Sequence, residues 1–316
     1  MNAAELEELI KTARDGQQDV LNLSHRELTV LPSSIQKLVF VKRLLLNDNK
    51  LLMPPTELIE LENLQVLTLD NNNLTLLPTG FGRLKNLSYL NISHNKLAFL
   101  PPEIGDLVNL IQLWVVDTGL INLPPETGLL RNLQKLGARD NAISSLPKEI
   151  HQMRSLQWLS LARNNLSELT DSFGRLPSLT YLDISHNAFD QVPPVLGELQ
   201  TLASLRIQGN DITTLPDELL IGLSRLTKLD LRDNPMTSRP PHWKGLEFIL
   251  LGPSPSEESV ATTSSDEWDD DDDEEVDILL SGDEEEEEGE EEDEDEENDA
   301  GLRGSNTVGD EYDAHR

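Results

Sequence analysis

The sequence predicts an α/β solenoid, a horseshoe with a parallel sheet on its concave side and short return segments on its convex side. Three observations predict it: an asparagine that recurs every 23 residues, an apolar frame with the same period, and a proline six residues after most of these asparagines. A period of this length is typical of repeat architectures. The series runs through Arg26, Asn49, Asn72, Asn95, Thr118, Asn141, Asn164, Asn187, Asn210 and, after one extra residue, Asn234.

Each unit of the repeat predicts one strand and one return segment. Two leucines separated by a single residue indicate a strand whose alternate side chains turn inward. The asparagine can bond the backbone of adjacent turns, because its side chain both donates and accepts hydrogen bonds. The proline, absent from only one of ten units, where Thr170 replaces it, fixes φ and opens a short helix or 3₁₀ turn. Stacked units would then bury their leucines in one continuous core.

The ends of the chain divide it into three predicted parts. Residues 3–14 place Leu6, Leu9 and Ile10 at helical spacing before Gly16, so residues 1–17 are expected to form a capping helix beside a first strand near residues 20–23. Residues 18–251 form the repeat domain, with ten units and a short last edge strand at residues 247–251. Such covers protect the open edges of a sheet. Residues 252–316 are expected to be a disordered acidic tail.

The frame LxxLxLxxNxLxxLPxxIxxLxx over residues 1–251 resembles that of leucine-rich repeat proteins. Its LPxxIxxLxxL return is similar to that of the Ras-group intracellular type, and the chain is similar to the Ras suppressor protein in this respect. The resemblance implies a protein-interaction scaffold or adaptor, in Ras-type signalling or adhesion complexes. It names no partner, because the outward-facing residues differ between members of the family.

Composition narrows the function classes. There are no cysteines, which excludes disulfides, thiol nucleophiles and cysteine metal sites. We expect an intracellular protein, cytoplasmic, nuclear or both, because residues 1–20 lack a signal pattern and no apolar run is long enough to span a membrane. Of the net charge of −33, residues 253–316 carry −28 and residues 1–252 carry −5. Carboxylate runs of this kind repel themselves and form no core. Direct binding to nucleic acid or anionic membrane is not expected.

The period also lists the side chains that the strands turn away from the core. Aromatic and basic residues gather there, and Tyr, Trp and Arg are enriched at binding hot spots. We therefore expect a monomer that binds a partner, for example a small GTPase or another signalling protein, on this face. The alternative is that the aromatic rings only pack against their neighbours on the sheet. The expected binding residues are Tyr89, Trp114, Lys135, Arg139, Trp158, Arg163, Tyr181 and Arg206.

Catalysis is not expected. His25, His94 and His186 share one position of the repeat, but they lie three and four units apart, roughly 14 and 19 Å at the usual strand spacing. No single metal ion or acid–base pair spans such distances. We expect no cofactor.

The tail supports a rival function. A polyanion can escort basic proteins such as histones or ribosomal proteins, and acidic histone-binding phosphoproteins share this layout of repeats and tail. It can also serve solubility alone. An apolar island at Val276, Ile278, Leu279 and Leu280 resembles a SUMO-interacting motif. A third function is regulation of a GTPase or phosphatase.

Overall fold

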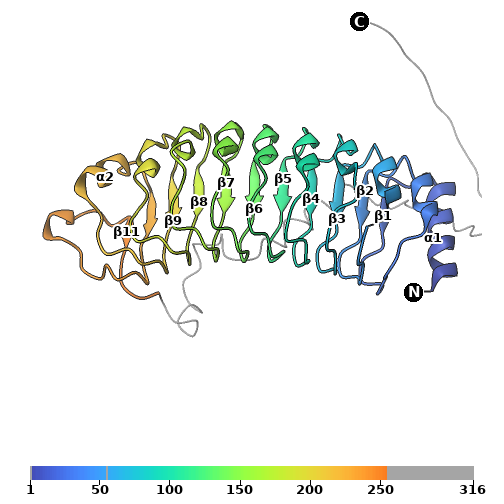
Figure 1. Ribbon diagram of the computed structural model, residues 1–316, viewed down its shortest axis with the longest axis horizontal. Helices are drawn as coiled ribbons and strands as arrows, with labels where there is room; N and C mark the ends of the chain where they lie inside the picture. The colour runs from blue at the N-terminus through green and yellow to red at the C-terminus, as the bar shows by residue number, and fades with distance from the viewer. Residues whose placement is uncertain (1, 55, 255–316) are drawn as a thin grey trace, which may run out of the picture. The chain divides into compact units, whose positions relative to one another are not determined.

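The computed structural model describes residues 2–54 and 56–254. The predicted acidic tail, with Val276, Ile278, Leu279 and Leu280, lies outside the described residues. Within them the repeat builds a sheet of eleven parallel strands in sequence order, flanked by return segments (Figure 1). The predicted solenoid is confirmed.

Each strand is short because only three residues of a unit run straight before the chain turns. The middle residue is a leucine that points into the core, and it pairs in register with the middle leucine of the next strand, as Leu67 does with Leu90. The strands are β1 Val20–Asn22, β2 Arg43–Leu45, β3 Val66–Thr68, β4 Tyr89–Asn91, β5 Gln112–Trp114, β6 Lys135–Gly137, β7 Trp158–Ser160, β8 Tyr181–Asp183, β9 Ser204–Arg206, β10 Lys228–Asp230 and β11 Ile249–Leu250. The last strand is shorter than the predicted span 247–251.

Most return segments are 3₁₀ helices, as the proline predicts. They are η1 Ser33–Lys37, η2 Thr56–Glu60, η3 Phe81–Arg83, η4 Pro102–Asp106, η5 Pro125–Leu129, η6 Lys148–Gln152, η7 Phe173–Arg175, η8 Pro194–Glu198 and η9 Pro241–Trp243. The 24-residue unit instead has an α-helix, α2 Asp217–Gly222. Six α-helical residues span about 9 Å and five 3₁₀ residues about 10 Å, so the α form absorbs the extra residue.

Both ends of the core are covered. Helix α1 Ala3–Asp15 begins with a capping box, in which Asn2 Oδ1 accepts from the Glu5 backbone N–H at 2.9 Å, and it buries Leu6, Ile10 and Ala13. At the other end Trp243 is buried, and its indole N–H donates to Asp217 at 3.2 Å. These contacts tie the last return segment to α2.

Candidate functional site

The asparagines of the period form a ladder that joins each unit to the one before it. Asn72 Nδ2 donates to the carbonyl oxygens of Leu46, Leu69 and Asp70 at 2.9–3.0 Å, and its Oδ1 accepts from Leu51 N–H at 3.0 Å. The other members make the corresponding bonds. Asn49, Asn72, Asn95, Asn164, Asn210 and Asn234 are buried, whereas Asn141 and Asn187 are half-buried. Asn141 is thus more exposed than most of the ladder, although it makes the backbone bonds that the sequence predicts.

Thr118 replaces asparagine in the ladder without leaving its hydroxyl unpaired. The hydroxyl donates to Val115 O at 3.1 Å and lies 3.0 Å from Asn141 Oδ1, and the side chain is fully buried. The hydroxyl thus keeps one of the carbonyl bonds that an asparagine amide makes in the other units, and the sheet continues through this unit.

The residue before each ladder position adopts a left-handed backbone conformation, with φ between 48° and 65°. This region suits glycine and, among other residues, favours Asn, Asp and His. The three histidines of this column are exposed members of it. Their shared position follows from backbone geometry rather than from a shared chemical site. The column is His25, Asp48, Asn71, His94, Asp117, Asp140, Arg163, His186, Gly209 and Asp233.

Three aromatic rings form a continuous stack on the side of the sheet that faces away from the core, here called the sheet face. Trp114 and Trp158 have ring centroids 5.4 Å apart with planes inclined at 51°, and Trp158 and Tyr181 lie 5.5 Å apart with planes 4° from parallel. Trp114 belongs to β5 and Trp158 to β7, so the indole of Trp114 must cross β6.

Gly137 on β6 makes that crossing possible. A Cβ atom at this position would come within 2.3 Å of Trp114 Cε3, so the ring lies directly over the glycine. Gly137 was not among the residues expected to contribute to binding on this face. The available signal was a glycine in a strand position that faces away from the core, where such residues mark a close approach.

Exposure divides the predicted binding residues into two groups. Tyr89 and Trp114 are only 3% and 4% exposed, yet neither belongs to the leucine core, so neighbouring side chains on the sheet face cover them. The expectation that both present open surface is wrong. Trp158 and Tyr181 are half-buried, and Lys135, Arg139, Arg163 and Arg206 also reach solvent.

The charges of the sheet face are arranged in mixed pairs. Asp140 lies 3.9 Å from Arg139 and 3.8 Å from Arg163, and Asp183 lies 4.0 Å from Arg206. On β10, Asp230 accepts two hydrogen bonds from Arg232, at 2.9 and 2.5 Å. The predicted basic residues on the C-terminal half of this face therefore lie among acids.

Asp183 is a buried acid of the sheet face. Burial raises the pKa of the Asp183 carboxyl, because the ionised form loses hydration. The backbone N–H and hydroxyl of Ser185, together with the charges of Arg206 and His186, oppose this shift. Asn91 occupies the same repeat position and bonds Ser93 N–H at 3.0 Å, as Asp183 bonds Ser185 N–H at 2.9 Å. A neutral amide can therefore supply the oxygen acceptor that Asp183 provides at this position.

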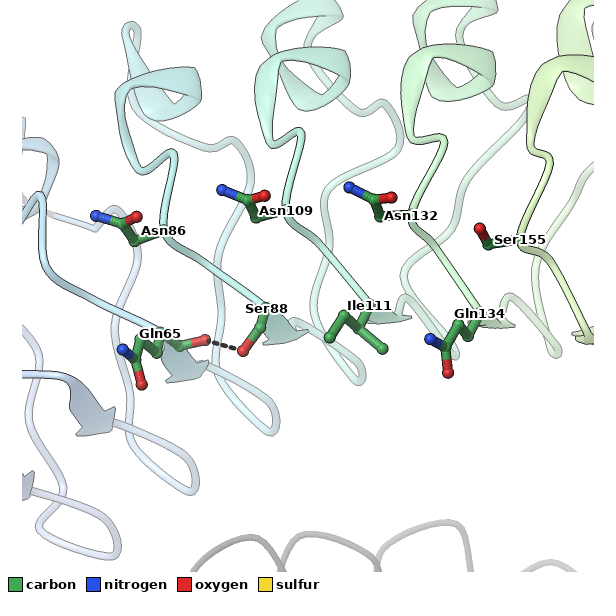
Figure 2. A pocket seen from close by; sticks show the side chains of 8 residues that line it. All are labelled: Gln65, Asn86, Ser88, Asn109, Ile111, Asn132, Gln134 and Ser155. Carbon is green, nitrogen blue, oxygen red and sulfur yellow. Dashed lines mark hydrogen bonds between the residues drawn. The ribbon is translucent and has the colours of Figure 1, made fainter.

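A second row of asparagines lies where the chain enters the strands (Figure 2). Asn86, Asn109 and Asn132 each donate an amide N–H to a carbonyl oxygen of the preceding unit at 2.8 Å. With Gln65, Ser88, Ile111, Gln134 and Ser155 they line a shallow groove of about 520 Å³. This row has the same 23-residue spacing as the ladder, so it is present in the sequence but was not among the predicted site residues.

The described residues hold no cluster of three His, Asp or Glu side chains arranged to bind a metal ion. Nor is any helix in residues 2–54 and 56–254 long and apolar enough to cross a membrane. The sheet face carries stacked aromatic rings with Asp–Arg pairs beside them. Such an arrangement can bind the surface of another molecule.

Comparison with known proteins agrees with the fold. A family model described as a leucine-rich repeat region matches residues 80–170, and a second, described as leucine rich repeat, matches residues 63–84 and 178–199. No curated protein sequence matches the chain.

Among solved structures, a leucine-rich repeat protein of Leptospira interrogans is similar at 31% identity and a TM-score of 0.59, over 77% of this chain and 74% of that one. The ectodomain of the Arabidopsis thaliana receptor kinase GASSHO1/SCHENGEN3, in complex with CASPARIAN STRIP INTEGRITY FACTOR 2, is 26% identical with a TM-score of 0.52, over 70% of this chain and 33% of that one. The plant peptide hormone receptor RGFR1, in complex with RGF2, is 28% identical with a TM-score of 0.51, over 75% and 45%. This chain thus spans less than half of either receptor. The repeat frame, the family-model matches and the identity and coverage of the Leptospira protein together show that the chain belongs to the leucine-rich repeat proteins.

Proposed function

We propose that the protein is a non-catalytic adaptor that binds a protein partner on its sheet face, with Trp158 and Tyr181 at the centre of the contact. The observation that carries this proposal is the nearly parallel pair of half-buried rings. Tyr and Trp supply large contact areas and lose little conformational entropy, because few of their bonds rotate. The stack immobilises them further, so a partner meets rings that are already positioned.

The paired charges around the rings give the contact its selectivity. Arg163 and Arg139 lie at 3.8–3.9 Å from Asp140, so both signs are present within one small area. A partner whose charges complement this pattern binds more tightly, and a partner that places like charges opposite it is repelled. Lys135 and Arg206 extend this area along the neighbouring strands. Trp114 packs against Trp158 and supports the stack, and Tyr89 is covered, so neither contacts the partner in this proposal.

The family supports a binding role. GASSHO1/SCHENGEN3 and RGFR1, which this chain resembles over part of their length, were each solved with a bound factor or peptide. For this chain we propose an intracellular partner, a small GTPase or another protein of Ras-type signalling, following the Ras-group character of the return segments.

Affinity capture with the full chain tests the proposal. The double variant Trp158→Ala/Tyr181→Ala should lose captured partners that the wild type retains, with affinities at least about tenfold weaker. The matched control is Glu149→Ala/Glu198→Ala on the return segments η6 and η8. Equal losses from both variants would contradict a site on the sheet face.

A second function is favoured by the charge of −28 on residues 253–316. Such a polyanion is suited to escort basic proteins such as histones or ribosomal proteins. Deletion of residues 257–316 separates the two functions. An adaptor keeps its partners after the deletion, whereas an escort loses basic ones, with binding that also falls steeply as salt increases.

A further inference from the structure

A stripe of exposed apolar side chains runs along the loops that leave strands β1 to β5. Its members are between 43% and 72% exposed. They occupy the third and fourth positions after the ladder residue of the first five units. We call them the loop stripe: Val30, Leu52, Met53, Leu76, Phe99 and Ile121.

The repeat frame does not require these residues to be apolar. In units one to nine the second and fifth positions after the ladder residue turn toward the core, as Leu74 and Leu77 do, and the two positions between them are exposed except for the half-buried Ala98. In units six to ten the same two positions hold only polar residues: Ser144, Ser145, Ser167, Glu168, Asp190, Gln191, Thr213, Thr214, Thr237 and Ser238. The two halves of the chain therefore carry different surfaces on one scaffold.

The stripe is continuous because backbone hydrogen bonds hold adjacent loops together. Lys50 N–H donates to Leu28 O at 2.8 Å, Asn73 N–H to Leu51 O at 2.9 Å, and Lys96 N–H to Leu74 O at 2.8 Å. Single exposed apolar residues are ordinary, but contiguous patches of them mark interaction surfaces.

The width and length of the stripe indicate what kind of partner it can bind. It is one side chain wide, two in the second unit, and crosses four inter-unit steps, roughly 19 Å at the strand spacing. A second copy of the chain would need roughly 800 Å² per partner for a stable dimer, more than six partly exposed side chains supply. An α-helix matches better, because its 5.4 Å pitch is close to the spacing of the units and about 13 residues cover the length.

From this geometry we infer that the loop stripe docks a short amphipathic α-helix of another protein, laid along the solenoid so that one apolar residue meets each unit. Charges of both signs occur in the same units: Lys50, which pairs with Glu27 at 2.9 Å, and Lys96 directly follow ladder residues, and Glu103 and Glu126 lie in η4 and η5. The bound helix therefore carries little net charge, and its apolar face supplies the affinity. This surface is separate from the aromatic stack.

A defined peptide tests the inference with the full chain. The probe is a lactam-stapled helix of about 14 residues, with leucines along one face and equal numbers of Glu and Lys elsewhere. A neutral probe avoids attraction to the acidic residues 253–316. The control peptide has the same composition with its leucines distributed around the helix. Fluorescence anisotropy of labelled peptide measures binding.

The chain offers a matched pair of variants. Leu76→Glu/Phe99→Glu adds two charges to the stripe, and Gln191→Glu/Thr214→Glu adds the same two charges to the same repeat position in the polar half. We expect the first variant to bind the probe at least about tenfold more weakly and the second to stay within about twofold of wild type. Val30→Ser/Met53→Ser, which adds no charge, should weaken binding in the same direction. Unchanged melting temperatures verify that the variants are folded.

Several results would overturn the inference: no binding of the probe, equal binding of the control peptide, or equal losses in the two glutamate variants. A concentration-dependent dimer in analytical ultracentrifugation that Leu76→Glu/Phe99→Glu abolishes would instead assign the stripe to a second copy. Trp158→Ala should leave probe binding unchanged. The docking of a helix on the loop stripe and the binding of a partner on the sheet face can therefore be tested independently.

Discussion

The indole of Trp114 lies directly over the α-carbon of Gly137, on the neighbouring strand, and reaches Trp158 on the strand beyond. One missing side chain thus lets a ring cross a whole strand. The aromatic stack depends on this contact, so a larger residue at position 137 should disturb the stack.

Gly137→Ala should displace Trp114, because the added Cβ atom would lie 2.3 Å from the ring. We expect a loss of about 1–3 kcal/mol in the free energy of unfolding, as for other overpacked sites, and a weaker near-ultraviolet circular dichroism signal from the stack. In a Trp114→Ala background the same glycine change should cost much less, which a double-mutant cycle would measure. Equal costs in both backgrounds would show that the ring is not the obstacle.

Leu90 and Leu159 are fully buried at the centres of β4 and β7. Leu→Ala at either position should lower the free energy of unfolding by about 2–5 kcal/mol, since it removes buried apolar surface and leaves a cavity. Urea denaturation measures the change. The exposed Leu76 provides the control, and its replacement by alanine should have an effect within about 0.5 kcal/mol.

Asn164→Ala should leave the carbonyl oxygens of Ala138, Leu161 and Ala162 and the N–H of Ile143 without their side-chain partner. Buried polar groups left in this state cost about 1–3 kcal/mol in total stability. Asn141→Ala removes corresponding bonds at a half-buried position, where water can replace some of them, so its cost should be smaller. Denaturant unfolding of both variants gives the order, and a larger loss at Asn141 would contradict this reasoning.

Asp183→Asn should stabilise the protein at neutral pH. The pKa of Asp183 is raised in the folded state, chiefly by burial, so the folded chain holds this proton more tightly than the unfolded chain, whose Asp pKa is about 3.9. Stability at this site is therefore lost as pH rises above about 4 and through the folded pKa. Asparagine removes that loss and keeps the acceptor for Ser185, as Asn91 does for Ser93.

The gain from Asp183→Asn should thus be present at pH 7 and vanish near pH 3, as measured by denaturant unfolding at both values. Asp230→Asn is the contrast, because Asp230 holds Arg232 through two hydrogen bonds. That change should lower stability at pH 7 by about 1–3 kcal/mol. A loss at both sites would show that the Arg206 interaction outweighs burial at Asp183.

The sequence predicted the strand positions and the proline-led returns because they follow from a frame with ten examples, in which single deviations matter little. The capping helix occurs once, but the helical spacing of its own apolar residues predicted it. Features that depend on one neighbouring side chain were missed. The covering of Trp114 depends on a single glycine in the next unit, and no period reports on the size of one neighbour. The change from 3₁₀ to α geometry at Asp217–Gly222 likewise depends on one additional residue.

The second asparagine row shows a different limit. Asn86, Asn109 and Asn132 recur every 23 residues, as the ladder asparagines do. Because the ladder alone accounts for this period, the period does not reveal that a second row exists. The loop stripe was also present in the sequence as a contrast between the two halves. Which loop positions are exposed became known only from the structure.

The asparagine ladder has a consequence for how such a chain can change in length. Each ladder asparagine bonds backbone groups in the loop of the preceding unit. A duplicated repeat of 23 residues therefore carries the side chain that the preceding unit needs for these bonds. Insertion or loss of a whole cassette preserves this reciprocity, whereas an insertion within a strand breaks it in two units at once. The Asn210–Asn234 interval shows the permitted exception: its extra residue sits in the return helix, and Asn234 still reaches Ile207 O and Ile212 N. The hydrogen bonds of this chain therefore allow it to lengthen by whole repeats, and they tolerate an extra residue only in the return segments.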